Sequence, residues 1–197
     1  KELEAFKDEE LSLQNRVDKD ILRTQLQYIV FAADELKEAE TSPLYYTSLI
    51  GDGLDPLVSR EFTTLEERMK ALLGRLRGVP KIVAVAKARL ANPALVHTET
   101  AITQNKGLVG LVEKDLAASF DKVPALKADL TDASKKAGAA LEDFQTFLEK
   151  DLKGRSKGDF RLGKARFEKK LRFYLDDAVD AAEVEKEARA LLQKTRD

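Results

Sequence analysis

Cysteine and tryptophan are absent from the 197-residue sequence, and there is one histidine, His97. Without cysteine, the chain can form neither a disulfide bond nor a thiolate zinc site. Cysteine usage therefore leaves the redox compartment undetermined. A single imidazole cannot supply an HExxH zinc motif, and no G-x-S-x-G nucleophile motif is present. We interpret His97 as a loop or helix-start residue.

Long apolar runs and an excess of one charge are also missing. No apolar run approaches the roughly 20 residues that a membrane-spanning helix needs. The chain has 34 Lys and Arg against 35 Asp and Glu, so no bulk charge favours nucleic acid or anionic lipid. It shows no signal peptide, begins with Lys1 and ends at Asp197 inside a helical pattern. We expect a fragment of a longer protein that forms a single helical domain over residues 1–197; trimmed ends are the alternative.

Helical periodicity dominates what is present. Apolar residues recur at spacings of three and four through most of the chain, and 35% of the residues are charged, which is typical of amphipathic helices. In the expected helix over residues 1–40, Lys19 lies on the charged side of an apolar face formed by Val17, Ile21, Leu22, Leu26, Ile29, Val30, Ala33 and Leu36. Residues 81–90 contain β-branched residues that also suit a strand, but Pro80 favours a helix. The sequence therefore predicts an all-α, irregular bundle of six to eight helices with no significant sheet.

Residues 42–62, SPLYYTSLIGDGLDPLVSREF, form the one long break in this pattern. Gly51 and Gly53 predict a sharp turn with positive φ, and Asp55-Pro56 predicts a new helix start. Because the segments on either side must be redirected here, we expect this stretch at the centre of the packing.

Further residue types predict where other elements begin, end and pack. A capping box, Thr64 with Glu67, predicts one helix start, while Gly78 and Pro80 predict a stop and restart. Two other expected caps are Thr98 and Asp180. In the stripe from Ala101 to Phe120, Gly107 and Gly110 suggest close approach of another helix, and Pro124 opens the next one. In the loop over residues 153–163, Phe160 and Leu162 should point inward.

Possible binding or catalytic residues have simpler explanations. Gly51 to Asp55 resembles part of a calcium or phosphate loop but lacks the remaining ligands of either, so we interpret it as a turn. The acidic pairs Asp176-Asp177 and Glu66-Glu67 suit solvated helix faces. Residues 150–172 hold ten bases and three acids, whereas residues 173–190 hold six acids and two bases, so the two stretches can satisfy each other. We therefore predict no catalytic, cofactor-binding or metal-binding residue and no nucleic-acid partner.

Three stretches resemble a bacterial family, the domain of unknown function numbered 885 (DUF885). They are residues 42–62 (quoted above), 76–97 (LRGVPKIVAVAKARLANPALVH) and 158–173 (GDFRLGKARFEKKLRF). Their order and spacing agree with the family, from the Val-Pro turn through the Asn-Pro stop to the Gly-Asp-Phe-x-Leu-Gly loop. These packing and turn motifs are specific for the family but carry no mechanism.

The resemblance implies that the intact protein is far longer, helical and similar to zinc metallopeptidases. Family members place an HExxxGH metal motif in the part that would follow Asp197, so no metal or catalytic residue can be assigned to this chain. The implied function is a non-catalytic N-terminal region that shapes the cleft and packs on the catalytic part, which would hold the zinc and act on peptides. Secretion or lipoprotein signals in many members favour an extracytoplasmic location. The alternative is a free-standing helical interaction or scaffold domain.

Overall fold

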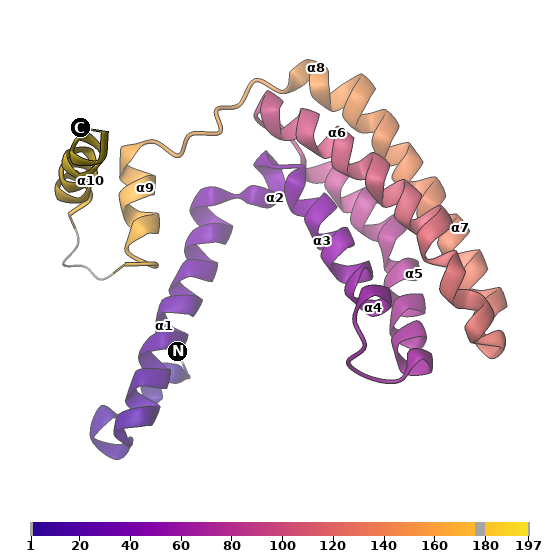
Figure 1. Cartoon of the computed structure of the whole chain (residues 1–197), viewed down its shortest axis with the longest axis horizontal. Coiled ribbons are helices and arrows are strands. Elements are labelled where there is room, and N and C mark those ends of the chain that lie inside the picture. Colours follow the sequence, from indigo (N-terminus) through magenta and orange to yellow (C-terminus); the bar gives the residue numbers. More distant parts are fainter. Residues whose placement is uncertain (1, 176–179, 197) are drawn as a thin grey trace. The chain divides into compact units, whose positions relative to one another are not determined.

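A computed structural model describes residues 2–175 and 180–196, and these residues are all-α as predicted (Figure 1). Seven of their α-helices have eight or more residues: α1 (Leu13–Phe31), α3 (Leu44–Leu54), α5 (Leu65–Arg89), α6 (Leu95–Gly110), α7 (Pro124–Phe147), α9 (Lys164–Leu171) and α10 (Ala181–Arg196). Shorter helices are α2 (Glu38–Thr41), α4 (Pro56–Ser59) and α8 (Lys153–Arg155). The described residues contain no strand, only an isolated bridge between Ala94 and Gly158. Residues 81–89 therefore continue a helix, as favoured over a strand.

Contacts divide the chain into two compact units. The central unit is Lys37–Phe160, and the terminal unit combines Lys1–Leu36 with Arg161–Asp197. The expected continuous helix over residues 1–40 is wrong. Instead α1 passes into a π-helical turn at Ala32–Leu36, and Lys37 then adopts a left-handed conformation with φ of 51°. That conformation is unfavourable for a residue with a Cβ, and it interrupts the helical hydrogen-bond pattern. That the chain forms a single domain stays a prediction.

The core of the central unit lies where α5 and α7 pack along each other, with α3 and α6 completing it (Figure 1). Each helix contributes residues spaced by three or four, because this spacing aligns side chains on one helix face. The predicted stripe from Ala101 to Phe120 is buried. The same spacing predicts a stripe from Leu126 to Leu148, which is also buried apart from the partly buried Leu126, so the periodicity is confirmed. Among the fully buried side chains are Leu72, Leu76, Val79, Leu116, Leu130, Leu141 and Phe144.

The predicted break at residues 42–62 is largely helical. Gly51 and Gly53 lie inside α3 and do not have positive φ, so the predicted turn is wrong. The central position is confirmed, because Tyr46, Ile50 and Leu54 are each at most 2% exposed. Glycine in a helix costs about 1 kcal/mol relative to alanine, and burial of each of these side chains contributes about 1.5–3 kcal/mol. Packing therefore outweighs the local preference, and α4 then begins with Pro56 as expected.

Of three smaller predictions about the central unit, one is confirmed and two are wrong. The capping box is confirmed, since the Thr64 hydroxyl accepts a hydrogen bond from the Glu67 amide at 3.3 Å. The interruption at Gly78 and Pro80 is wrong, because α5 continues through both residues. Thr98 is not a cap but a buried residue of α6.

Glycine contacts and the final loop also correct two expectations. No atom lies within 4 Å of a Cβ built on Gly107 or Gly110. Close approach occurs instead at Gly51, where a Cβ would lie 3.4 Å from Leu108 Cδ2. Phe160 is 53% exposed, so the prediction that it points inward is wrong. Pro124 opens α7 as predicted.

The terminal unit is built on α1. Lys19 lies on the buried side of α1, contrary to the expected solvated position. Its ammonium group donates to the Phe6 carbonyl at 2.6 Å and to Asp8 Oδ1 at 2.7 Å. Arg23 donates to Glu4 Oε1 at 2.9 Å. These bonds fasten the two short 3-10 turns, Leu3–Ala5 and Asp8–Glu10, along α1.

Aromatic rings join α9 and the residues after it to α1. The Tyr28 ring lies 5.6 Å from Phe173 and 5.7 Å from Tyr174, both nearly edge-on, and Phe31 lies 5.4 Å from Phe173. Edge-to-face contacts at such distances are favourable beyond the area that they bury. At the start of α10, Asp180 Oδ1 accepts a hydrogen bond from the Ala182 amide at 2.9 Å, which confirms the predicted cap.

Acidification is expected to release the N-terminal turns from α1. The hydrogen bond from Lys19 lowers the pKa of Asp8 below its usual 3.8, and that from Arg23 lowers the pKa of Glu4 below its usual 4.5. For carboxyls with lowered pKa, the contribution to stability is present above the usual values and is lost as the pH falls below about 4. Backbone amide NMR signals of residues 3–10 should therefore shift together in this range.

A matched pair of variants tests this clasp. Asp8→Asn removes the negative charge that Lys19 contacts, so the N-terminal amide signals of this variant should already be shifted at neutral pH. Glu9→Gln changes an exposed acid of the same turn and should leave the pH dependence of these signals unchanged. N-terminal amide signals of Asp8→Asn that are identical to those of the unsubstituted chain at neutral pH would show that this carboxylate does not hold the turns.

Candidate functional site

A groove of about 470 Å³ lies between α3 and α6 in the central unit, and it contains the Gly-Asp-Gly stretch that the sequence singled out. Its walls are lined by Thr47, Ser48, Gly51, Asp52, Asp55, Pro56, Arg60, Gln104, Gly107, Leu108 and Leu111. The small residues Ser48 and Gly107 leave open space beside the helix backbones, whereas Leu108 closes the space beside Gly51. We refer to this hollow as the α3–α6 groove.

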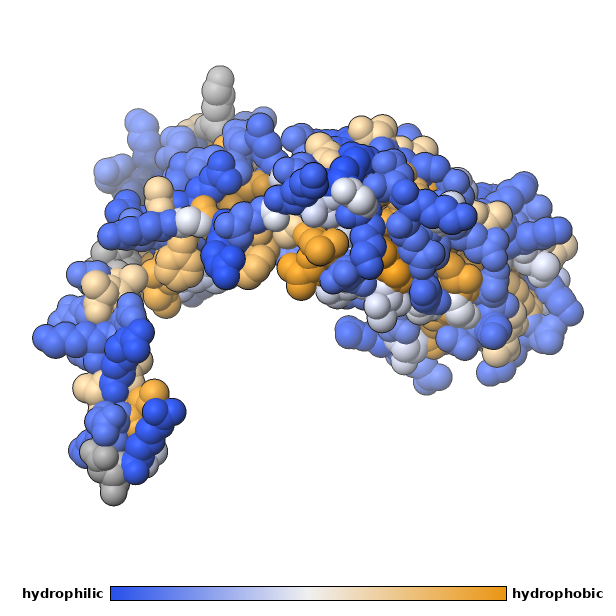
Figure 2. Space-filling model, turned by 90° about the horizontal axis from the view of Figure 1, so that it is seen from above, coloured by the Kyte–Doolittle hydropathy of each residue, from blue (hydrophilic) through white to orange (hydrophobic). Residues whose placement is uncertain are grey.

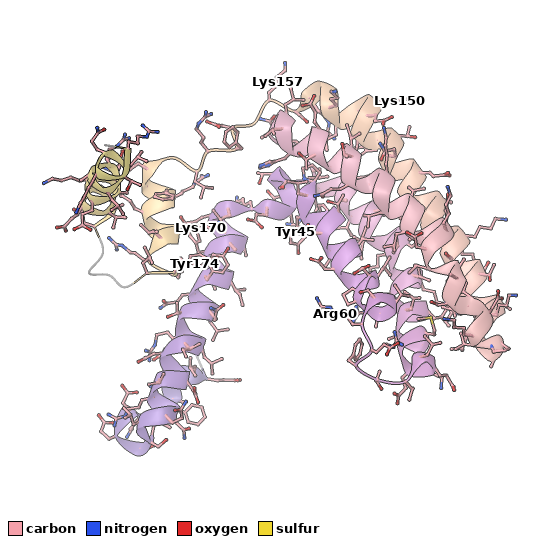
Figure 3. The ribbon with its side chains drawn as sticks, in the orientation of Figure 1. Tyr45, Arg60, Lys150, Lys157, Lys170 and Tyr174 are labelled. Carbon is pink, nitrogen blue, oxygen red and sulfur yellow. The ribbon has the colours of Figure 1, made fainter. Side chains whose placement is uncertain are left out.

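Polar groups of the α3–α6 groove are positioned by the two helices. The buried Thr47 hydroxyl donates to Gln104 Oε1 at 2.7 Å and thereby links the helices below the groove. Asp52 and Asp55 are exposed, and Asp55 accepts a hydrogen bond from the Ser59 hydroxyl at 3.1 Å. Arg60 follows α4 and is also exposed (Figure 3). The groove can therefore offer carboxylates, hydroxyls and a guanidinium group to a polar molecule, but its lining contains no imidazole, thiol or amine.

The structure does not bring Gly51 to Asp55 into a calcium or phosphate loop. These residues form the last turn of α3, and Arg75 donates a hydrogen bond to the Gly53 carbonyl. A loop that binds phosphate would present backbone amides instead. The alternative that we preferred, a turn, is also wrong, because the segment is helical.

His97 is the third residue of α6, so its interpretation as a helix-start residue is confirmed. The side chain is half-buried, and Nδ1 is buried without a hydrogen-bond partner among the described residues. Among residues 2–175 and 180–196, no group of three His, Asp or Glu side chains could hold a metal ion.

The acidic pair Glu66-Glu67 serves the start of α5. Glu67 accepts hydrogen bonds from the Thr63 and Thr64 hydroxyls, which lower the pKa of its carboxyl. Glu66 pairs with Lys70 one turn later at 2.7 Å. Carboxylates stabilise the positive end of a helix, so these roles are structural. Asp176-Asp177, the other predicted pair, lies outside the described residues.

The division between the two units falls inside residues 150–172. In the central unit, Lys153 pairs with Glu99 at 3.2 Å, while Lys150 and Lys157 are exposed (Figure 3). In the terminal unit, Lys164 pairs with Glu168, and Lys169 with Glu35. These acids lie outside residues 173–190, and Asp176 and Asp177 of that stretch lie outside the described residues, so mutual neutralisation of the two stretches stays a prediction.

Sequence reasoning missed the role of Arg155. Its guanidinium donates to Asp151 within its own helical segment, to the Leu90 carbonyl at 3.0 Å and to the Ala91 carbonyl at 2.7 Å. Free carbonyls at a helix C-terminus attract cations, and Arg155 meets those that follow α5. Nearby, the buried hydroxyls of Thr98 and Ser156 lie 2.8 Å apart. No local pattern could reveal these pairs, because about 60 residues separate the partners.

A second groove, of about 490 Å³, lies in the terminal unit, and the sequence did not predict it. Its floor is apolar, with Leu26, Val30, Phe31 and Phe173. Two ion pairs, Glu4–Arg23 and Glu35–Lys169, lie on its rim. Such a composition suits an apolar side chain more than a polar substrate. We refer to it as the α1 groove.

Comparisons with known proteins agree with the fold. The sequence profile of a family described as "Bacterial protein of unknown function (DUF885)" matches residues 1–197. No curated protein matches the chain. A solved structure from Shewanella oneidensis, described as "a putative lipoprotein of unknown function", is similar, with a TM-score of 0.82 and 22% sequence identity.

Coverage differs between the two proteins. The similarity covers 99% of this chain but 36% of the Shewanella oneidensis chain, so this chain spans about a third of the length of that protein. At this identity the match supports the fold alone. Since the family profile matches the chain from its first to its last residue, this chain belongs to the DUF885 family of bacterial proteins of unknown function.

Proposed function

We propose that this chain is the non-catalytic N-terminal helical part of a longer bacterial zinc-dependent peptidase. The observation that carries the proposal is the match over 99% of this chain to 36% of another protein's chain, because the same fold there is one part of a longer polypeptide. The resemblance to proteins similar to zinc metallopeptidases supplies the expected chemistry. The rest of the parent polypeptide would hold the metal and the catalytic groups.

The described residues do not fit a zinc site themselves. Zinc is usually held by at least three His, Cys or carboxylate side chains. The chain has one histidine and no cysteine, and no suitable group of three ligands occurs in the described parts. In the proposed role, the chain instead shapes the cleft, and the α3–α6 groove could supply Asp52, Asp55 and Arg60 to the charged groups of a peptide.

Location is part of the proposal. We place the parent protein outside the cytoplasm, attached as a lipoprotein. The description of the Shewanella oneidensis protein supports this placement. No helix within the described ranges is long and apolar enough to cross a membrane.

Zinc content and peptidase activity test the proposal. After dialysis, residues 1–197 should retain essentially no zinc, whereas the parent protein should retain about one ion per chain. Only the parent should cleave an unfolded protein substrate, and chelation should abolish that activity. The control is chelation followed by added zinc, which should restore it.

Two results would contradict this function. One is stoichiometric zinc in residues 1–197, or turnover by this chain that depends on one of its own side chains. The other is a reading frame that ends after Asp197, which would favour a free-standing interaction or scaffold domain.

A further inference from the structure

Helix α1 exposes large aliphatic side chains on two opposite sides. With about 100° between successive residues, Leu22, Leu26, Ile29 and Val30 share one side, which we call the outer α1 face. Val17 and Ile21 lie on the other side, together with Tyr28 and Phe31. Each of the six aliphatic side chains is 46% to 59% exposed. A surface helix normally carries one apolar face, so aliphatic residues on two sides of α1 are more than a single contact would cover.

Contacts within the terminal unit cover only part of the apolar surface of α1. The aromatic cluster covers Tyr28 and Phe31, and the Lys19 and Arg23 bonds fasten the N-terminal turns. The N-terminal turns cover this side of α1 at Lys19, but the four residues of the outer α1 face each stay 51% to 59% exposed. The α1 groove adjoins this face at Leu26 and Val30. On the face of the molecule that Figure 2 shows, hydrophobic residues form patches among hydrophilic ones.

We propose that the outer α1 face is the docking surface for the part of the parent polypeptide that this chain lacks, and that the docking element is a helix. This inference rests on the proposed function. The uncovered row from Leu22 to Val30 is about 12 Å long, which suits one helix–helix crossing. The α1 groove beside it would receive one large apolar side chain of that helix, as interface pockets commonly do.

The length of the missing polypeptide favours this occupant over a second copy of the chain. In the similar solved structure, 64% of the chain lies outside the matched part, which is enough to supply several covering elements. A symmetric dimer uses the same patch on both copies, so a dimer through the outer face would leave Val17 and Ile21 exposed. A longer polypeptide can cover both sides at once.

Single cysteines provide a direct test, because the chain has none of its own. Ile29→Cys places a thiol on the outer α1 face, and Arg16→Cys places a matched thiol at an exposed position of α1 about 140° around the helix from Ile29. In residues 1–197, both should react rapidly with a maleimide probe. In the parent protein, position 29 should react at least about tenfold more slowly, whereas position 16 should keep its rate. Peptide mass spectrometry resolves each site from other thiols.

Equal reactivity of position 29 in both proteins would overturn the proposal. Protection in residues 1–197 alone that grows with protein concentration would also overturn it, since a second copy would then be the occupant. If Ile29→Cys prevents the parent from folding, hydrogen exchange of α1 in the unsubstituted proteins decides: slower exchange in the parent supports docking, and equal exchange contradicts it.

The test of the docking surface and the test of the proposed function can give different results. Protection of position 29 in a parent without zinc or peptidase activity would retain the docking surface and reject the enzyme. A zinc peptidase with an accessible position 29 would do the reverse.

Discussion

Gly158→Ala is expected to destabilise the central unit by about 2–4 kcal/mol. A Cβ at this position would overlap the Asn92 carbonyl oxygen and lie 3.1 Å from the Pro93 carbonyl carbon. Both obstacles are backbone atoms, so no side-chain rotation can relieve the overlap. Overpacking of this kind costs about 1–3 kcal/mol even before hydrogen bonds are lost.

The hydrogen bonds around Gly158 raise the expected cost. Its amide donates to the Pro93 carbonyl at 3.0 Å, and the Lys157 amide donates to Asn92 Oδ1 at 2.9 Å. Moving the loop to make room for a methyl group would break one or both bonds, at about 1 kcal/mol each. These contacts join the loop after α8 to the connection between α5 and α6, which lie far apart in sequence.

Gly154→Ala is the matched control. No atom lies within 4 Å of a Cβ at Gly154, which is in α8, and alanine favours helix over glycine. This variant should be unchanged or up to about 1 kcal/mol more stable. Urea unfolding followed by circular dichroism measures both. A Gly158→Ala midpoint equal to that of the unsubstituted chain would show that the loop tolerates a side chain.

Asn105→Asp is expected to cost about 3–5 kcal/mol at pH 7. Asn105 is fully buried in α6, and its Nδ2 donates to the Leu141 carbonyl and to Gln145 Oε1, each at 2.9 Å. An aspartate of the same shape replaces this donor with an oxygen, and the Leu141 carbonyl cannot donate in return. A buried charge facing acceptors is among the most destabilising changes known.

The pH dependence of Asn105→Asp has a definite sign. Burial and nearby acceptor oxygens favour the neutral carboxyl, so the folded-state pKa of the new aspartate is raised. A raised pKa makes the penalty smallest at low pH and largest above the folded-state pKa. The variant should therefore approach the stability of the unsubstituted chain as the pH falls from 7 to 5.

Asn15→Asp is the control, because it introduces the same charge at an exposed position. Asn15 is exposed in the first turn of α1, where a carboxylate is favourable, so this variant should lose no stability at pH 7. Thermal unfolding at several pH values compares the two variants. An Asn105→Asp variant as stable as Asn15→Asp would show that water or rearrangement solvates the buried position.

Local patterns predicted that the helices exist more reliably than they predicted where each helix begins or ends. Thr64, Pro56, Pro124 and Asp180 begin or cap helices as expected, because a cap is made by residues within one turn. Gly51, Gly53 and Pro80 misled the prediction, because buried neighbours hold these residues in helices despite their preferences. The intrinsic helix propensity of a residue is therefore a poor guide to its structure where tertiary packing contributes several kcal/mol.

Local sequence patterns could not predict the grooves, because segments far apart in sequence line each of them. Gly51 to Asp55 attracted attention as a possible ligand loop, but the hollow beside it requires Gln104, Gly107 and Leu111 from α6. The α1 groove joins residues near the N-terminus to Lys169 and Phe173. A sequence indicates which side chains are available, but the contact between distant helices decides which of them line one surface.

Residues within a few turns of each other were enough to predict the all-α class, the buried stripes of α6 and α7 and the helix starts at Pro56, Thr64, Pro124 and Asp180. Only the tertiary structure decided that Lys19 is buried, that Arg155 meets the carbonyls after α5 and that α1 keeps an apolar face uncovered. The physical reason is that burial is a property of pairs of surfaces. Spacing along the chain places side chains on a face, but it cannot say what, if anything, packs against that face.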